Sequence, residues 1–292
     1  MRRMIKFHPA VIAIFFACVV FYTMYSNNPI ILIISLVCSL IFYLVLEDGR
    51  KFFQYLLFVL LVGSIITITN PLFVSRGETV LFTVWGKIIT KESLVYGAAM
   101  AMMLLAIITW FKCYNKIMTM DKFIYLFGKP LPSIATTISL GITFIPRFIE
   151  KGKAINTAQK NLGLYEQKKL GRIRLNLRVF SSLITWALEN SLDTADSMNA
   201  RGYGLKQKTR FSVFRYKISD LLLTIIMLSL MAFIIVGSAL KYLDYKYYPQ
   251  LTPTSFDLFN ILLYIALGCL MLIPTFIEVK ENIKWNFFKS KI

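Results

Sequence analysis

The stretch Ala195-Asp196-Ser197-Met198-Asn199-Ala200-Arg201-Gly202-Tyr203-Gly204 ends a long, charged and amphipathic segment of a chain that is otherwise strongly apolar. A helix that stops at a glycine leaves its last carbonyl groups bare, and an arginine in that last turn complements the helix dipole. The guanidinium group of Arg201 also extends beyond the helix end, where it can hold a carboxylate through two hydrogen bonds. We therefore expect a docking tip for another protein at this point.

The rest of the chain has the composition of an integral membrane protein. Hydrophobic residues make up 57% of the 292 residues and the mean hydropathy is +0.63, whereas soluble domains are about 45–50% apolar. Six runs approach the length of about 20 residues that spans a bilayer; they are Ala10–Tyr25, Ile30–Leu46, Phe52–Ile68, Leu94–Phe111, Leu221–Leu240 and Phe256–Ile277. We predict an all-α integral membrane protein with about six transmembrane helices and two long cytoplasmic helices.

The net charge of +18 arises from 33 Lys and Arg residues against 15 Asp and Glu residues. When the chain is threaded with its N-terminus inside, 28 of the 33 basic residues lie on the cytoplasmic side. This asymmetry follows the positive-inside rule and predicts that both termini are cytoplasmic. Because the charges lie between apolar runs and not in a soluble basic domain, no nucleic-acid partner is expected.

Three parts of the chain differ in character. Residues 1–120 form a predicted bundle of four spans, residues 121–217 a polar helical domain, and residues 218–292 a pair of spans. An outer segment near residues 70–93 alternates at Val80, Phe82 and Val84, which predicts a small hairpin or interfacial flap. Both a substrate lid and packing at the lipid headgroups fit this flap. We assign no metal or redox role to the four scattered cysteines and no role to His8.

The polar region contains two predicted long helices. The first is expected to start after Pro132 with Ser133 as its N-cap, to kink at Pro146 and to end at Gly163. The second covers about residues 173–200, or about 42 Å. It is apolar on two sides, which predicts a helix sandwiched between two neighbours. One stripe is Ile173, Leu177, Phe180, Ile184, Leu188, Leu192 and Ala195, and the other is Leu175, Val179, Leu183 and Trp186.

The remaining side of the second helix has an unusual order of charges. It starts basic with Arg174 and Arg178 and finishes acidic with Glu189, Asp193 and Asp196. Acids near a helix C-terminus oppose the helix dipole, at a cost of about a few tenths of a kcal/mol each. Two explanations are open: pairing with nearby cytoplasmic lysines, or a contact surface for a partner beside Arg201.

These motifs resemble a known family. The run from Ala195 to Gly204 is similar to the second signature of the transmembrane T subunits of energy-coupling factor (ECF) vitamin and metal importers, the CbiQ-like family. Three further stretches of this chain resemble segments of the family: Thr90-Lys91-Glu92-Ser93-Leu94, Phe127-Gly128-Lys129-Pro130 and Phe144-Ile145-Pro146-Arg147. The first signature aligns with Ala158-Gln159-Lys160-Asn161-Leu162-Gly163, where Leu162 replaces the usual docking arginine. The resemblance therefore implies two chemically unequal tips.

The resemblance implies a noncatalytic coupling subunit in a bacterial or archaeal cell membrane. Such a subunit relays the ATP-driven motion of two cytoplasmic ABC ATPases to a substrate-binding S component, for uptake of a vitamin or transition-metal ion. It binds no cofactor itself, because the ATPases use ATP and Mg. The implied ATPase-docking residues are Ala158, Gln159, Lys160, Leu162, Gly163, Ala200, Arg201 and Gly202; those facing the S component or the chain's own bundle are Ile173, Leu177, Phe180, Leu183, Ile184, Trp186, Leu188 and Leu192.

Other function classes are less well supported by the sequence. The chain has no G-x-x-x-x-G-K-[ST] phosphate loop, so ATP hydrolysis is expected elsewhere. Glu47, Asp48, Asp257 and Glu278 fall near span ends, whereas a proton-coupled transporter keeps such groups at mid-membrane. A membrane scaffold or assembly factor and a membrane-embedded enzyme without a recognisable catalytic motif are the alternatives. Co-purification with ATPases would distinguish the coupling-subunit function from both alternatives.

Overall fold

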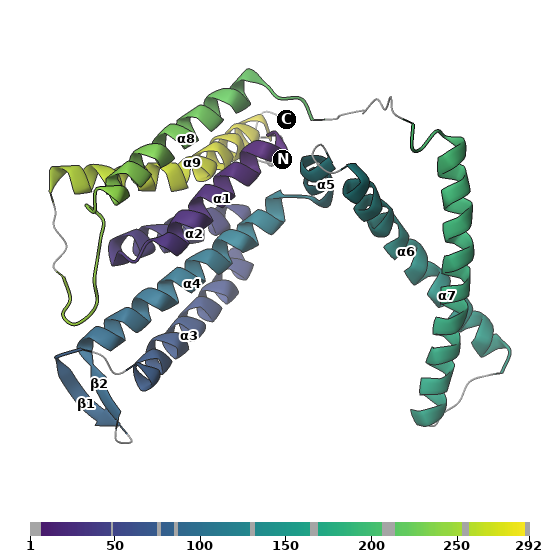
Figure 1. Cartoon of the computed structure of the whole chain (residues 1–292), viewed down its shortest axis with the longest axis horizontal. Helices are drawn as coiled ribbons and strands as arrows, with labels where there is room; N and C mark the ends of the chain where they lie inside the picture. Colours follow the sequence, from purple (N-terminus) through teal and green to yellow (C-terminus); the bar gives the residue numbers. More distant parts are fainter. Residues whose placement is uncertain are drawn as a thin grey trace. The chain divides into compact units, whose positions relative to one another are not determined.

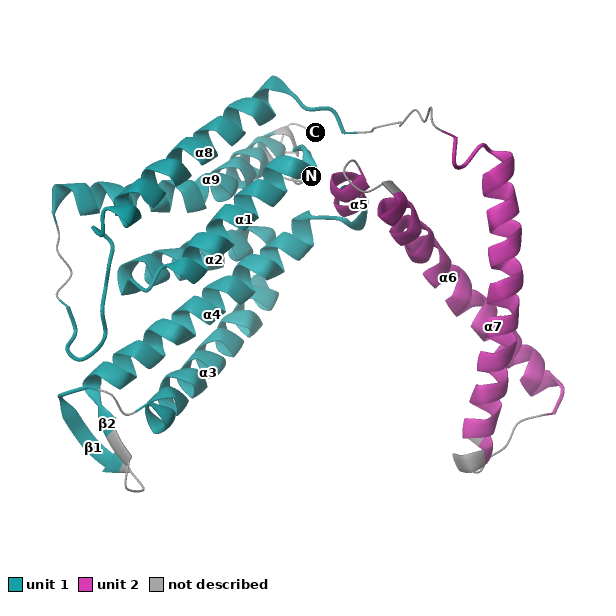
Figure 2. Ribbon diagram, viewed as in Figure 1, with its two compact units in different colours: residues 1–122, 214–292 teal, residues 123–213 magenta. Residues whose placement is uncertain are grey.

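The computed structural model describes residues 7–47, 49–74, 77–84, 87–128, 132–163, 169–205, 214–252 and 257–289. The chain divides into two compact units, Met1–Lys122 with Phe214–Ile292, and Phe123–Val213 (Figure 2). The elements of the described ranges are α1 (Pro9–Tyr25), α2 (Pro29–Leu46), α3 (Gly49–Phe73), β1 (Val80–Val84), β2 (Lys87–Thr90), α4 (Lys91–Ile117), α5 (Met120–Gly128), α6 (Pro132–Asn161), α7 (Lys169–Ala200), α8 (Ile218–Ala239) and α9 (Leu258–Lys289) (Figure 1).

The first unit contains the membrane-spanning helices. Of its described helices, α2, α3, α4, α8 and α9 are long and apolar enough to cross a membrane, and α1 is a shorter apolar helix. These six coincide with the six predicted apolar runs, so the predicted spans are confirmed. His8, to which the sequence analysis assigned no role, caps α1: its Nδ1 accepts a hydrogen bond from the Ala10 N–H at 3.2 Å.

Interhelical contacts around Trp110 join α1, α2 and α4. The Trp110 ring is fully buried, and its centroid lies 5.8 Å from that of Phe15 and 6.1 Å from that of Phe42. Its Nε1 donates to Ser35 Oγ at 3.2 Å, and Ser35 Oγ lies 2.9 Å from Thr23 Oγ1. Small hydroxyl side chains that hydrogen-bond between helices hold spans together where lipid is as apolar as the side chains themselves.

The hairpin predicted near residues 70–93 is present and leads directly into α4. Strands β1 and β2 pair antiparallel, with a register shift between Val80 and Phe82. Thr90 then forms a reciprocal capping box with Ser93 at the start of α4. The Thr79 hydroxyl donates to the carboxylate of Glu92 at 2.7 Å. The family-like segment from Thr90 to Leu94 is thus a helix start that holds the hairpin against α4.

The second unit is built around α6 and α7, which cross each other (Figure 1). The expectation that Ser133 caps α6 is wrong, because α6 begins at Pro132 and Ser133 lies inside the helix. A proline suits the first turn, where a backbone N–H would have no intrahelical acceptor. The helix continues through Pro146, and α7 begins at Lys169, earlier than the predicted Ile173.

Candidate functional site

The end of α7 is a complete Schellman motif. Gly202 has a φ of +81°, in the left-handed region, and its N–H donates to the Asn199 carbonyl at 2.9 Å. The Tyr203 N–H donates to the Met198 carbonyl at 3.0 Å. These two bonds satisfy carbonyls that the helix leaves free, and they make Arg201 the C-cap residue. The Arg201 side chain is exposed beyond the last turn.

The end of α6 shares the left-handed glycine and the first of these two bonds. Gly163 has a φ of +75°, and its N–H donates to the Lys160 carbonyl at 3.1 Å. Leu162 therefore occupies the C-cap position of α6, as Arg201 does in α7. Each helix ends two residues before a left-handed glycine, so the structure places the two aligned motif positions, Leu162 and Arg201, at the same distance from the helix end. The side chains there differ completely, since one is apolar and the other carries a guanidinium group.

Most of the predicted docking residues are exposed at these two tips. Leu162 is 75% exposed, and Ala158, Lys160 and Gly163 on α6 and Ala200 and Arg201 on α7 are also exposed. Gly202 is half-buried. Gln159 is different, because its side chain is only 8% exposed. The α6 tip thus presents Lys160 and Leu162 outward and turns Gln159 inward.

The two apolar stripes of α7 have different environments. Leu175 is buried, and Val179, Leu183 and Trp186 are half-buried on the face that packs against α6. The Trp186 ring meets Phe148 edge to face, with centroids 5.6 Å apart, and Lys151 Nζ lies 5.6 Å from the Trp186 ring centroid. Of the predicted partner-facing set, Leu183 and Trp186 therefore lie on the α6 side.

The other six members of that set form the second face, which we call the α7 apolar stripe: Ile173, Leu177, Phe180, Ile184, Leu188 and Leu192. Their exposed fractions run from 44% at Ile184 to 68% at Leu192. At one edge of the stripe, a shallow groove between α6 and α7 is lined by Phe148, Gly152, Asn156, Asn176 and Phe180, among others. An apolar face of this length on an amphipathic helix is typical of a protein-interaction surface.

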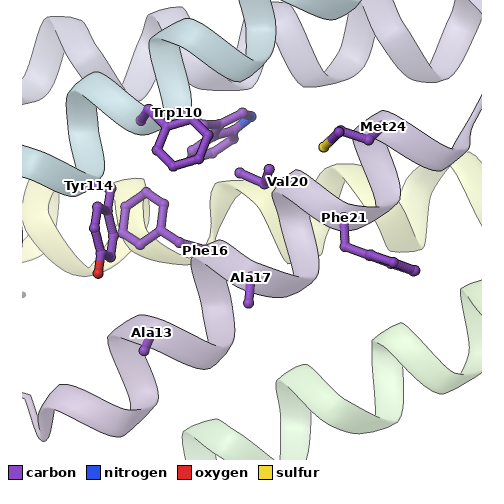
Figure 3. Close-up of a pocket in the computed structure, with 9 residues that line it drawn as sticks. Ala13, Phe16, Ala17, Val20, Phe21, Met24, Trp110 and Tyr114 are labelled. Carbon is purple, nitrogen blue, oxygen red and sulfur yellow. The ribbon is translucent and has the colours of Figure 1, made fainter. Parts of the chain in front are cut away.

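The first unit has a separate apolar groove between α1 and α4, with a volume of about 360 Å³ (Figure 3). Ala13 and Ala17 leave space on α1, while Phe16, Trp110 and Tyr114 form its walls. Such a surface suits an acyl chain or a neighbouring helix. It offers no charged group that would select a polar substrate.

Several features were missed by the sequence analysis. The buried Asn28 side chain donates to the Leu243 carbonyl at 3.2 Å and to the Tyr264 hydroxyl at 3.0 Å, which ties the loop after α8 to the turn between α1 and α2. Lys122 is 2% exposed, and this burial lowers its pKa to about 8. Within the described ranges, no group of three or more His, Cys, Asp or Glu side chains is arranged to hold a metal ion.

The chain is similar in sequence to known proteins. Residues 7–213 match the CbiQ family, described as cobalt transport protein. The chain is 28% identical over 177 residues to the energy-coupling factor transporter transmembrane protein EcfT of Listeria innocua serovar 6a, covering 55% of this chain and 66% of that protein. It is 28% identical over 110 residues to EcfT 1 of Listeria monocytogenes serotype 1/2a, covering 37% of this chain and 41% of the relative.

The chain thus spans just under two thirds of the first relative and about two fifths of the second. The family match is more extensive, since it covers well over half of the 292 residues and includes four spans, the hairpin and both helix tips. The chain belongs to the CbiQ cobalt transport protein family.

Proposed function

We propose that this protein is the noncatalytic transmembrane coupling subunit of an ECF-type importer. It relays ATP-driven movement of two cytoplasmic ABC ATPases to a substrate-binding S component. Family membership and the relatives' names support this function. The observation that carries it is the pair of long helices, α6 and α7, which both end at a left-handed glycine with Leu162 and Arg201 exposed directly before it.

The two tips bind their ATPases by different chemistry. Arg201 forms a bidentate pair with a carboxylate of one ATPase. Leu162 is 75% exposed, and in the described part of this tip Lys160 is its exposed cationic neighbour, so the contact at Leu162 is mainly apolar. Salt screens charge pairs but does not weaken apolar burial, so the two contacts respond differently to ionic strength. Two nonidentical ATPases, each bound to one tip, would match this difference in chemistry.

The α7 apolar stripe is the surface offered to the S component. It is exposed over the length of α7 while the opposite face is held by α6, so movement imposed at Arg201 reaches the stripe through one continuous helix. This chain then needs no cofactor, because ATP and Mg are bound by the ATPases and the vitamin or transition-metal ion by the S component.

The distribution of basic residues supports a cytoplasmic location for both termini and for residues 121–217. Single cysteines introduced into a chain without its native cysteines test this orientation. Exposed positions are chosen: Asn27 and Lys241 on the outer side, Lys160 and Lys284 on the inner side. An impermeant maleimide should label the first two from outside and the last two only after lysis. Outside labelling at Lys160 or Lys284 overturns the orientation.

The function is tested by reconstitution. The chain is co-expressed with the ATPases and an S component of its host's ECF system, and the complex is placed in liposomes. We expect ATP-dependent uptake that is lost when this chain alone is left out, because the ATPases and the S component then have no link. Uptake or stable assembly without this chain would show that it is a scaffold or an unrelated membrane protein.

A further inference from the structure

The α7 apolar stripe is flanked by charges in a regular order. Arg174 directly follows Ile173, Arg178 follows Leu177, Glu189 follows Leu188 and Asp193 follows Leu192. Consecutive helical residues are about 100° apart, at 3.6 residues per turn, so all four charges lie on the same flank of the stripe. All four are exposed, and none of the ion pairs in the described part of the chain involves them.

This order is symmetric about the middle of the helix. Arg174 and Asp193 lie equally far from the point between Leu183 and Ile184, and so do Arg178 and Glu189. The stripe residues have nearly the same symmetry, with Ile173 opposite Leu192 and Leu177 opposite Leu188. In the second half each basic residue is replaced by an acidic one. Reversing the direction of α7 therefore gives the same apolar stripe with charges of opposite sign.

We propose that two copies of this chain pair through their α7 apolar stripes in antiparallel orientation, with Arg174 of each copy against Asp193 of the other and Arg178 against Glu189. A two-fold axis perpendicular to α7 brings residues of the same flank together, so all four pairs form at once. Such a self-complementary patch is what a two-fold interface requires. A parallel pair would place the charged flanks of the two copies on opposite sides of the interface, so none of these four pairs could form, and flanking charges of this kind fix helix orientation in coiled coils.

The charges are what favour a second copy as the occupant. The apolar stripe alone would accept many amphipathic helices, including one from the S component. The order of Arg174, Arg178, Glu189 and Asp193, however, is matched by α7 itself. It also accounts for acids at the C-terminal end of α7, where the helix dipole disfavours them, and for arginines near its N-terminal end. Because one face cannot hold two partners, pairing is a property of the subunit when no S component covers the stripe.

Cross-linking in membranes tests the orientation. Chains lacking Cys18, Cys38, Cys113 and Cys269 receive a single cysteine in place of Leu177 or Leu188, with a different tag on each. The two chains are co-expressed and treated with a short bismaleimide. We expect the Leu177→Cys chain to cross-link to the Leu188→Cys chain, and neither chain to cross-link to its own kind. Cross-links at 177–177 or 188–188 in preference, or none between copies, overturn the proposal.

Charge reversal tests whether the four charged residues pair as proposed, and a mixture of two reversed variants serves as the folding control. The variants Arg174→Glu/Arg178→Glu and Glu189→Arg/Asp193→Arg should each self-pair about tenfold less than the wild type, because every interfacial pair becomes repulsive. Co-expressed, the two variants should pair with each other as well as wild-type copies do. Undiminished self-pairing of either variant, or no recovery in the mixture, contradicts the proposal. Arg201 is unchanged in these variants, so ATPase retention, measured on the same samples, tests the proposed function separately.

Discussion

Replacing Gly202 by alanine is the sharpest perturbation of the α7 tip. At φ +81°, a residue with a side chain is strained, whereas glycine is not. The two cap hydrogen bonds, from Gly202 to Asn199 and from Tyr203 to Met198, depend on this conformation. The substitution keeps Arg201 but weakens the cap that positions it. It therefore tests whether docking depends on the position of the arginine and not only on its presence.

The magnitude follows from the backbone. The left-handed conformation costs a residue with a Cβ about 1–2 kcal/mol, and the reduced freedom of alanine in the unfolded chain returns about 0.4–1 kcal/mol. The new methyl group would lie 2.9 Å from Leu205 Cδ1, the end of a flexible side chain that can rotate away. We expect a net loss of about 1 kcal/mol in the local stability of the cap, or about a fivefold increase in its open population.

Hydrogen exchange of the full chain measures this directly. Protection of the amides at positions 202 and 203 should fall about fivefold in Gly202→Ala and less in Gly202→Asn, because asparagine tolerates the left-handed region. Gly204→Ala is the matched control, since its φ of +104° is also strained but it contributes to neither cap bond. Unchanged protection in Gly202→Ala, or an equal loss in Gly204→Ala, would refute this account of the tip.

Three further predictions concern other parts of the chain. The pKa of Lys122, lowered to about 8, means that the unfolded state binds more protons at this residue between pH 8 and 10.5. Over this interval the melting temperature of the wild type should therefore rise relative to that of Lys122→Met, and a constant difference between the two would contradict the prediction. Asn28→Ala removes the side chain that donates to the Leu243 carbonyl and should lower the free energy of unfolding by about 1–3 kcal/mol. Melting of the protein in detergent measures this loss, and an unchanged melting temperature would show that the buried bonds contribute little. Leu162→Asp should reduce ATPase retention at both low and high salt while Leu162→Arg is tolerated, and full retention by Leu162→Asp would make Leu162 an ordinary helix-end residue.

The spans and the helix ends could be predicted because their causes are local. Apolar runs of sufficient length locate α2, α3, α4, α8 and α9, and glycines in the left-handed region end α6 and α7 where the motifs placed them. The predicted N-cap of α6 was wrong because two signals are adjacent in the sequence: Ser133 is a good N-cap residue, and the proline before it suits the first turn of a helix. The proline lies at the helix start.

Tertiary contacts account for what could not be predicted. Asn28 hydrogen-bonds to Leu243 and Tyr264, which are more than 200 residues away in the sequence. The helical period indicates that α7 is apolar on two sides, but only its packing against α6 shows that Leu183 and Trp186 are covered while the six stripe residues are exposed. Likewise, Gln159 and Leu162 belong to one motif, yet one is buried and the other exposed.

The most direct test of the coupling role is the fraction of each ATPase retained on the purified chain when Arg201 is changed. Arg201→Lys keeps the charge but loses the planar fork, and Arg201→Ala loses both. Retention of one ATPase at low salt should fall from wild type to Arg201→Lys to Arg201→Ala, while the exposed Arg215→Ala control behaves as wild type. The difference between wild type and Arg201→Ala should shrink as salt is raised, because salt also weakens the charge pair of the wild type. Full retention of both ATPases by Arg201→Ala, at low and high salt, would contradict the account.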